Sequence, residues 1–176
     1  MFGIIFIAIL VIGYFMILNS KVKNKGAILL EKTITAVLST LVFSLYLAYL
    51  GYTPVEEQQA NIAYISFEGN FMISLTYSLP VYLICGGLYS FFADIYLNKV
   101  HLRYAFLKYI IGCLVYLIGG LLIVGLFSAI LLLTFHGSIN KLFISEFFRV
   151  SALTSLLFYH ISLISKMVLK FIPRLD

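Results

Sequence analysis

The sequence predicts an all-α fold, a transmembrane bundle of about five helices with the N-terminus outside and the C-terminus in the cytoplasm. Hydrophobic residues make up 62% of the 176 residues and charged residues 11%, whereas an ordinary soluble domain is about 45–50% apolar and about 25% charged. The apolar residues form uncharged runs of the length that crosses about 30 Å of hydrocarbon as a helix. These runs do not alternate in polarity as the strands of a membrane β-barrel do. We therefore expect one integral membrane domain over residues 1–176.

The first run, Phe2–Leu18, is near the lower length limit for a spanning helix. It matches a signal peptide only in part, because no basic residue precedes it and Lys21 and Lys23 follow it. We interpret it as a retained first helix. The alternative is a bundle of four spanning helices, with this run or the last one lying in the membrane interface.

The second run, Ile34–Tyr52, ends at a glycine and a proline, and the third run is Phe71–Leu97. Pro80 lies inside the third run, and we expect it to kink the helix because proline lacks the amide hydrogen and clashes with the preceding turn. Together with Gly86 and Gly87, this kink is either static or part of a hinge or broken helix that lines a cavity.

The fourth run, Tyr109–Phe135, is 27 residues long and uncharged. The fifth and weakest, Phe147–Ser165, carries Arg149 near its start and His160 near its end. The three-residue spacing of Glu146 and Arg149 predicts a local ion pair. Small residues allow membrane helices to pack closely, so the glycines of the fourth run predict that it packs against the third: Gly112, Gly119, Gly120 and Gly125.

The basic residues predict the orientation of the chain. Ten of the 12 lie in the first connection, the third connection and the C-terminal tail, whereas the second connection holds none. Alternate connections share one side of the membrane, and short basic loops stay in the cytoplasm. In this assignment Lys32 belongs to the first connection and Lys166 to the tail. We expect the net charge of +5 to serve topology and contact with anionic lipid, with no nucleic acid partner.

Asp94 is the strongest candidate for a functional residue, because a carboxylate inside a membrane helix is costly and often marks function. Helical spacing places it with Ser90 and two glycines on one small, polar face, which should look into the bundle. The structural alternative is that Asp94, close to the cytoplasmic end of its helix, reaches water or pairs with Lys99 or Arg103.

His160 is expected at a similar depth, where an Asp–His pair would relay protons or sense pH. The alternative is a neutral histidine bonded to a tyrosine or serine. The predicted binding residues therefore form an intramembrane polar cluster: Asp94, His160, Ser90 and Pro80.

Motifs of known enzymes are missing from the sequence, and we expect no catalytic residue, metal site or cofactor. The pair Glu56-Glu57 lacks the arginine that the paired-glutamate motif of membrane-embedded CAAX-type proteases needs four places later, where Asn61 stands. The chain has no HExxH, GxSxG or GxxxxGK pattern. Cys85 and Cys113 lack metal-ligand spacing, and we interpret them as buried reduced thiols.

The stretch from Tyr77 to Asp94, with Pro80, Gly86 and Ser90, precedes a basic loop and a glycine-rich helix. This arrangement resembles small multi-pass membrane proteins of unknown role in Bacillus-type Gram-positive bacteria. The resemblance covers roughly a third of the chain. It implies a plasma-membrane location and no particular activity, so no functional residue carries over.

The sequence thus predicts an integral, multi-pass protein of the bacterial plasma membrane, a non-enzymatic partner, immunity or regulatory protein. The alternative is a small solute transporter or transporter subunit with a site near Asp94, between the third, fourth and fifth helices. A transporter needs a polar cavity near the middle of the membrane, whereas a partner protein or homo-oligomer needs a face open to another helix. A membrane enzyme would need Asp94 and His160 within hydrogen-bond reach.

Overall fold

A computed structural model describes residues 25–60, 62–100, 104–135 and 141–171. Within these residues the chain is built from helices and has no strand. Four segments are long and apolar enough to cross a membrane: Gly26–Glu57, Phe67–Lys99, Ala105–Gly125 and Phe148–Leu169. The predicted all-α transmembrane bundle is therefore confirmed for this part of the chain. The first predicted helix, Phe2–Leu18, lies outside the described residues.

Helix α2 (Lys25–Gly51) begins well before Ile34, where the uncharged run predicted its start. Glu31 and Lys32 lie in its second turn and have polar partners inside the bundle. Because these charges are paired, they do not end the helix. The prediction that Lys32 belongs to a solvated connection is wrong for this reason.

The two faces of α2 are arranged the opposite way round from those of a helix in a soluble protein. The face toward the other helices is largely polar and buried, with Glu31, Lys32, Thr35, Ser39, Thr40 and Ser44. The outer face is apolar and exposed, with Leu30, Leu38, Val42, Leu45 and Tyr49. The hydroxyls of Thr35 and Thr40 each donate to the carbonyl four residues back, at 2.8 and 2.7 Å. This arrangement is expected of a helix in lipid, where small and polar side chains mediate contacts between helices.

A long connection that contains a 3-10 turn, η1 (Val55–Glu57), joins α2 to α3 (Phe67–Val81). Ser66 caps the start of α3, since its Oγ accepts a backbone N–H of the first turn at 3.1 Å. Asn70 donates its side-chain amide to the carbonyl of Gly51 at 2.9 Å. The end of α2 and the start of α3 are thereby held together.

Helix α3 continues without a loop into a π-helical turn, η2 (Tyr82–Gly86), and then into α4 (Gly87–Lys99). Pro80 lies in the last turn of α3. Proline removes one backbone hydrogen bond from a helix, and a π turn is a common way for a helix to absorb a local irregularity. The break predicted at Pro80 and the two glycines is therefore a short π segment inside one continuous span.

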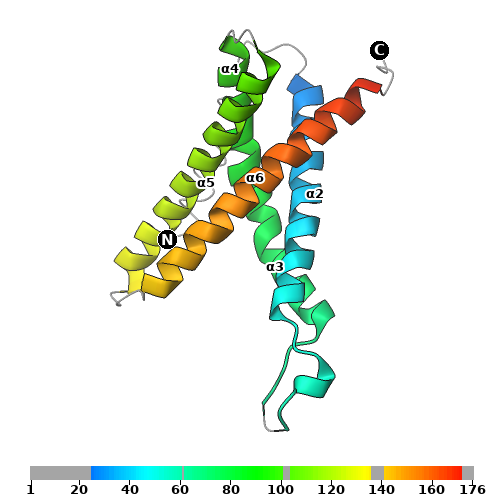
Figure 1. The fold of residues 1–176 in the computed structure, drawn as a ribbon, viewed down its shortest axis with the longest axis vertical. Coiled ribbons are helices and arrows are strands. Elements are labelled where there is room, and N and C mark those ends of the chain that lie inside the picture. Colours follow the sequence, from blue (N-terminus) through cyan, green and yellow to red (C-terminus); the bar gives the residue numbers. More distant parts are fainter. Residues whose placement is uncertain (1–24, 61, 101–103, 136–140, 172–176) are drawn as a thin grey trace.

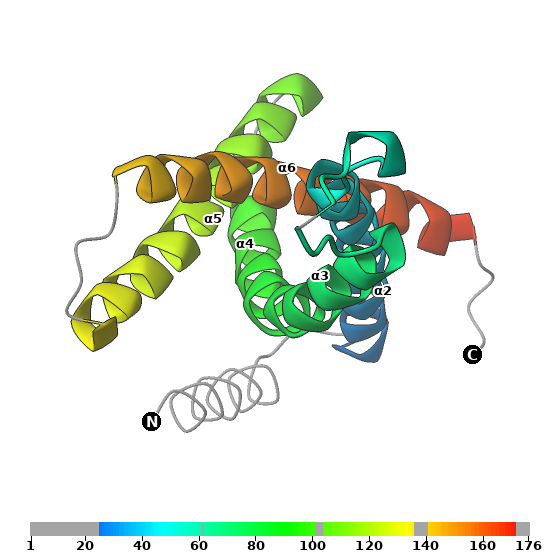
Figure 2. The same ribbon diagram turned by 90° about the horizontal axis from the view of Figure 1, so that it is seen from below.

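Helices α5 (Ala105–Phe135) and α6 (Lys141–Phe171) complete the described bundle. Helix α6 runs obliquely from the far end of α5 to the first turns of α2 and packs against both (Figures 1 and 2). It continues past Ser165, the predicted end of the fifth run, so Lys166 lies in the helix. The prediction that Lys166 belongs to a C-terminal tail is therefore wrong.

The start of α2, the end of α4 and the end of α6 lie at one end of the bundle, and the loop with η1 lies at the other (Figure 1). The first of these ends carries lysines of three helices, and the second carries Glu56 and Glu57 in η1. The alternation of connections that the charge pattern predicted is thus present in the described helices.

The glycines of α5 make room for two different helices. A Cβ at Gly120 would lie 2.6 Å from the Cβ of Ser155 on α6, and Gly112 also faces α6. Gly119 instead faces Tyr89 on α4, whose hydroxyl donates to a backbone carbonyl of α5 at 2.5 Å. The prediction that these glycines pack against the third run holds for Gly119 and is wrong for the two that face α6.

Candidate functional site: a charge cluster inside the bundle

Lys32 of α2 and Asp94 of α4 form an ion pair inside the bundle. Lys32 is only 4% exposed, and the Asp94 side chain is 15% exposed. The two residues are 62 positions apart in the sequence. They meet because the start of α2 and the end of α4 lie at the same end of the bundle (Figure 1).

Two further residues complete what we call the charge cluster, which consists of Glu31, Lys32, Asp94 and Lys166. The ammonium of Lys166 on α6 lies 2.7 Å from Oδ2 of Asp94. The ammonium of Lys32 also lies 3.1 Å from Oε1 of Glu31. Ser162, one turn before Lys166, donates to the same Glu31 oxygen at 3.1 Å. The cluster therefore ties α2, α4 and α6 together with two positive and two negative groups.

Tyr116 connects the charge cluster to α5. Its hydroxyl donates to Oδ1 of Asp94 at 3.2 Å and shares a 2.8 Å hydrogen bond with Oγ of Ser90. Tyr116 and Ser90 are both buried. Each of the four described spans thus contributes at least one residue to the network around Asp94.

The electrostatics of the charge cluster differ from those of a surface ion pair. Charges removed from water cost several kcal/mol each unless close partners compensate them, and here the formal charges sum to zero. The predicted pair of Glu146 and Arg149 is confirmed at 3.0 Å, but both side chains are exposed, and such a pair is typically worth less than about 1 kcal/mol. Ionisable groups inside membrane spans face the bundle interior and commonly mark functional sites.

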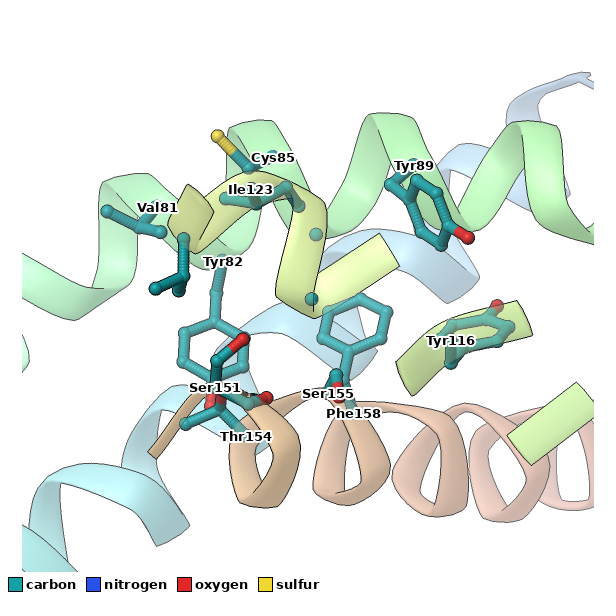
Figure 3. A pocket seen from close by; sticks show the side chains of 13 residues that line it. Val81, Tyr82, Cys85, Tyr89, Tyr116, Ile123, Ser151, Thr154, Ser155 and Phe158 are labelled. Atoms are coloured by element: carbon teal, nitrogen blue, oxygen red, sulfur yellow. Dashed lines mark hydrogen bonds between the residues drawn. The ribbon is translucent and has the colours of Figure 1, made fainter. Parts of the chain in front are cut away.

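A cavity of about 110 Å³ lies between the α3–η2–α4 span, α5 and α6 (Figure 3). Tyr116 lines it, so one side chain contacts both the Asp94 carboxylate and the cavity. Gly86, also in the wall, precedes Asp94 by eight residues, or about 12 Å along a helix. Segment η2 lies at the middle of the span Phe67–Lys99. The cavity is therefore near the middle of the span, and the charge cluster is near one end.

The structure brings some of the predicted site residues together and leaves others apart. Asp94 and Ser90 share the hydroxyl of Tyr116. Pro80 does not touch the charge cluster; it precedes the π turn that carries Tyr82 into the cavity wall. Asp94 is held by lysines of α2 and α6, and Arg103, one of the partners that its structural alternative supposed, lies outside the described residues.

His160 is exposed and has other partners than Asp94. Its Nδ1 lies 2.7 Å from the carbonyl oxygen of Leu156, and its Nε2 lies 2.8 Å from the hydroxyl of Tyr109. A carbonyl only accepts hydrogen bonds, so Nδ1 must carry the proton and a neutral ring accepts from Tyr109 at Nε2. The Asp–His relay is not formed, and the alternative of a histidine bonded to a tyrosine describes the site.

Sequence reasoning does not identify Lys32, Glu31 and Lys166 as site residues, because a charge beside an apolar run predicts a connection outside the membrane. A signal for Lys32 was nevertheless present in the sequence. Polar residues continue from Glu31 and Lys32 into the apolar run at helical spacings, at Thr35, Ser39 and Thr40. A polar stripe of this kind predicts that the charged pair belongs to the same helix face.

Among the described residues, no group of three or more His, Cys, Asp or Glu side chains is placed to hold a metal ion. Cys85 and Cys113 are free and half-buried, and Cys85 lines the cavity. No protein-family model matches the chain, and neither does a curated protein or a solved structure.

Proposed function

We propose that this chain is a small multi-pass carrier of the bacterial plasma membrane, which binds a small solute in the cavity between its third, fourth and fifth predicted helices. The observation that carries the proposal is the double contact of Tyr116, which bonds the Asp94 carboxylate and lines the cavity. Carriers place their binding sites near the middle of the membrane, at irregular helix segments. The π turn η2 in the cavity wall is such a segment.

The charge cluster supports a coupling role. Asp94 is shared by Lys32, which is buried, and Lys166, whose side chain is 33% exposed. Lys166 is thus the partner of Asp94 that solvent reaches more easily. A proton or cation that arrives from the solvent would replace the ammonium of Lys166 at the Asp94 carboxylate. A change in the charge of Asp94 alters its hydrogen bond with Tyr116. Because Tyr116 lines the cavity, this change also alters the cavity wall. Occupation of the cavity and the charge state of the cluster would then influence each other.

The proposal predicts a charge movement that depends on Asp94. The full chain is reconstituted in vesicles of phosphatidylethanolamine and phosphatidylglycerol, and the current after a pH jump from 7 to 3, below the ordinary pKa of an aspartate of about 3.9, is recorded by solid-supported membrane electrophysiology. We expect a transient charge displacement that falls at least about tenfold in Asp94→Asn, because one carboxylate carries it. Glu146→Gln, which removes a carboxylate from an exposed ion pair, should leave it unchanged. Equal currents in the native chain and in folded Asp94→Asn would refute a carrier coupled through Asp94, and a stoichiometric protein partner in the purified sample would favour a regulatory subunit instead.

We further propose that the end with the charge cluster faces the cytoplasm, where its lysines contact anionic lipid headgroups. The prediction is tested in a chain whose Cys85 and Cys113 are replaced by alanine. A cysteine at Gln59, in the loop after η1, should react with a membrane-impermeant thiol reagent in intact cells. A cysteine at Tyr104, between α4 and α5, should react only after lysis. The reverse pattern would invert the orientation.

A further inference from the structure

The cavity combines an apolar wall with a few hydroxyl groups. Its apolar part comes from Val81, Ile123, Val124 and Phe158, together with two glycines, and no charged side chain of the described residues lines it. Its polar groups belong to Tyr82 of η2, Tyr89 of α4, Tyr116 of α5 and Ser151, Thr154 and Ser155 of α6. Small-molecule sites commonly have this composition, with apolar contacts for affinity and a few polar groups for orientation.

Two of these hydroxyls have no hydrogen-bond partner within the described part of the chain, Oη of Tyr82 and Oγ of Ser151. Tyr82 is 8% exposed and Ser151 is 3% exposed, so bulk water does not form hydrogen bonds with these hydroxyls. Figure 3 shows Tyr82 reaching from its own helix toward α6, where the side chain of Thr154 lies close enough to interact with it. Thr154 donates its hydroxyl to the carbonyl of Ser151 at 3.0 Å, so toward Tyr82 it can act only as an acceptor.

The other hydroxyls of the wall are engaged. Tyr89 donates to a backbone carbonyl, Tyr116 bonds Asp94, and Ser155 donates to the carbonyl of Ala152. A buried hydroxyl without a partner is unfavourable, and two of them on one cavity wall form a place for one hydrogen-bonding group of a ligand. An ionic ligand is disfavoured, because the charged residues nearby already compensate one another.

The cavity also reaches the outer surface of the bundle. Val81 is part of its lining and is 46% exposed, on the face that lipid would cover. A cavity of about 150 Å³ accepts benzene. The cavity of this protein is smaller, about 110 Å³. It therefore encloses a ligand slightly smaller than one aromatic ring, or it holds an aromatic ring of which one part remains at the opening of the cavity.

We infer that this cavity binds a small neutral molecule with an apolar body and one hydroxyl head, such as a phenol or a short alcohol, which enters from the bilayer and bonds Tyr82 and Ser151. The inference rests on the proposed function in that it names the class of solute carried. Its binding step involves residues of the cavity wall and none of the four charged residues of the cluster.

Cys85 provides a local test, since it lines the cavity and Cys113 does not. In a Cys113→Ala chain in detergent micelles, the rate at which methyl methanethiosulfonate modifies Cys85 is measured by mass spectrometry. We expect 4-fluorophenol to slow this modification in a saturable way. Fluorobenzene, the same ring without the hydroxyl, should need a concentration about 25-fold higher for half protection, as expected for the loss of two net hydrogen bonds.

Tyr82→Phe and Ser151→Ala should each raise the half-protecting concentration of 4-fluorophenol about fivefold, the effect of one of the two hydrogen bonds, and leave that of fluorobenzene unchanged. Tyr77→Phe is the matched control, because Tyr77 precedes the same π turn and is 75% exposed. Both probes protecting equally, or neither protecting at millimolar concentration, would overturn the inference. So would protection of Cys85 by lipid alone, seen as slow modification in phosphatidylglycerol nanodiscs without a probe.

Protection measured in Asp94→Asn separates this inference from the proposed function. If 4-fluorophenol still protects Cys85 while the charge displacement is the same in native and variant chains, the binding site stands and the coupling to Asp94 fails. If the charge displacement depends on Asp94 but neither probe protects Cys85, the carrier proposal stands and the solute class is wrong.

Discussion

Replacing Lys32 with methionine should lower the free energy of unfolding by about 3–5 kcal/mol, the usual cost of removing one partner from a buried ion pair. Methionine keeps the length of the side chain, so packing changes little. The loss would come from charge, because Glu31, Asp94 and Lys166 would be left with a net charge of −1 where little water reaches them. Pulse proteolysis in mixed micelles of detergent and SDS measures the change.

The double variant Lys32→Met with Asp94→Asn makes this prediction specific to charge. Asp94→Asn alone leaves a net charge of +1 and should also be strongly destabilising. Together the two changes leave Glu31 and Lys166, which sum to zero, so the double variant should be at least as stable as either single variant. Strictly additive losses would mean that the residues do not interact in the folded chain.

The exposed ion pair of Glu146 and Arg149 is the reference with which the loss of stability at Lys32 is compared. Glu146→Gln breaks an ion pair of similar length, 3.0 Å, whose side chains are 61% and 78% exposed. Water screens such a pair, and its loss should cost less than about 1 kcal/mol. A loss at Lys32 no larger than the loss at Glu146 would show that the charge cluster is hydrated.

Gly120→Ala should destabilise the bundle by about 1–3 kcal/mol through overpacking. The added Cβ would lie 2.6 Å from the Cβ of Ser155 and 3.1 Å from the carbonyl oxygen of Ser151. Neither atom is the end of a flexible side chain, so α5 and α6 must move apart. Because α6 also holds Lys166 and Ser162 near α2, this movement would reach the charge cluster. Pulse proteolysis measures the loss, and reduced charge displacement should accompany it.

Gly87→Ala is the matched control. It makes the same chemical change within a span, and its Cβ would meet only the carbonyl of Tyr82, at 4.0 Å. Alanine favours helix over glycine by about 1 kcal/mol, so Gly87→Ala should be neutral or slightly stabilising. Equal effects at Gly87 and Gly120 would rule out close packing as the cause.

The composition and the long uncharged runs were sufficient to determine an all-α membrane bundle. Long apolar helices have few stable alternatives in lipid, because every backbone amide must be paired within the chain. The same reasoning identified Pro80 and its neighbouring glycines as a break, since a missing amide and a missing side chain have local consequences. It also identified Asp94, because a carboxylate inside an apolar run is costly in lipid and often marks function.

The tertiary structure alone decided which residues surround Asp94 and which do not. Local sequence assigned Lys32 and Lys166 to connections, because an isolated lysine is excluded from hydrocarbon. Only the antiparallel arrangement of α2 and α4, with α6 packed against α2, supplies the opposite charges that keep these lysines inside. His160 is the converse case, a polar residue within a span that the rotation of α6 turns outward toward Tyr109. The cost of burying a charge depends on its partners, and Asp94, the partner that both lysines share, is 62 positions from Lys32 in the chain.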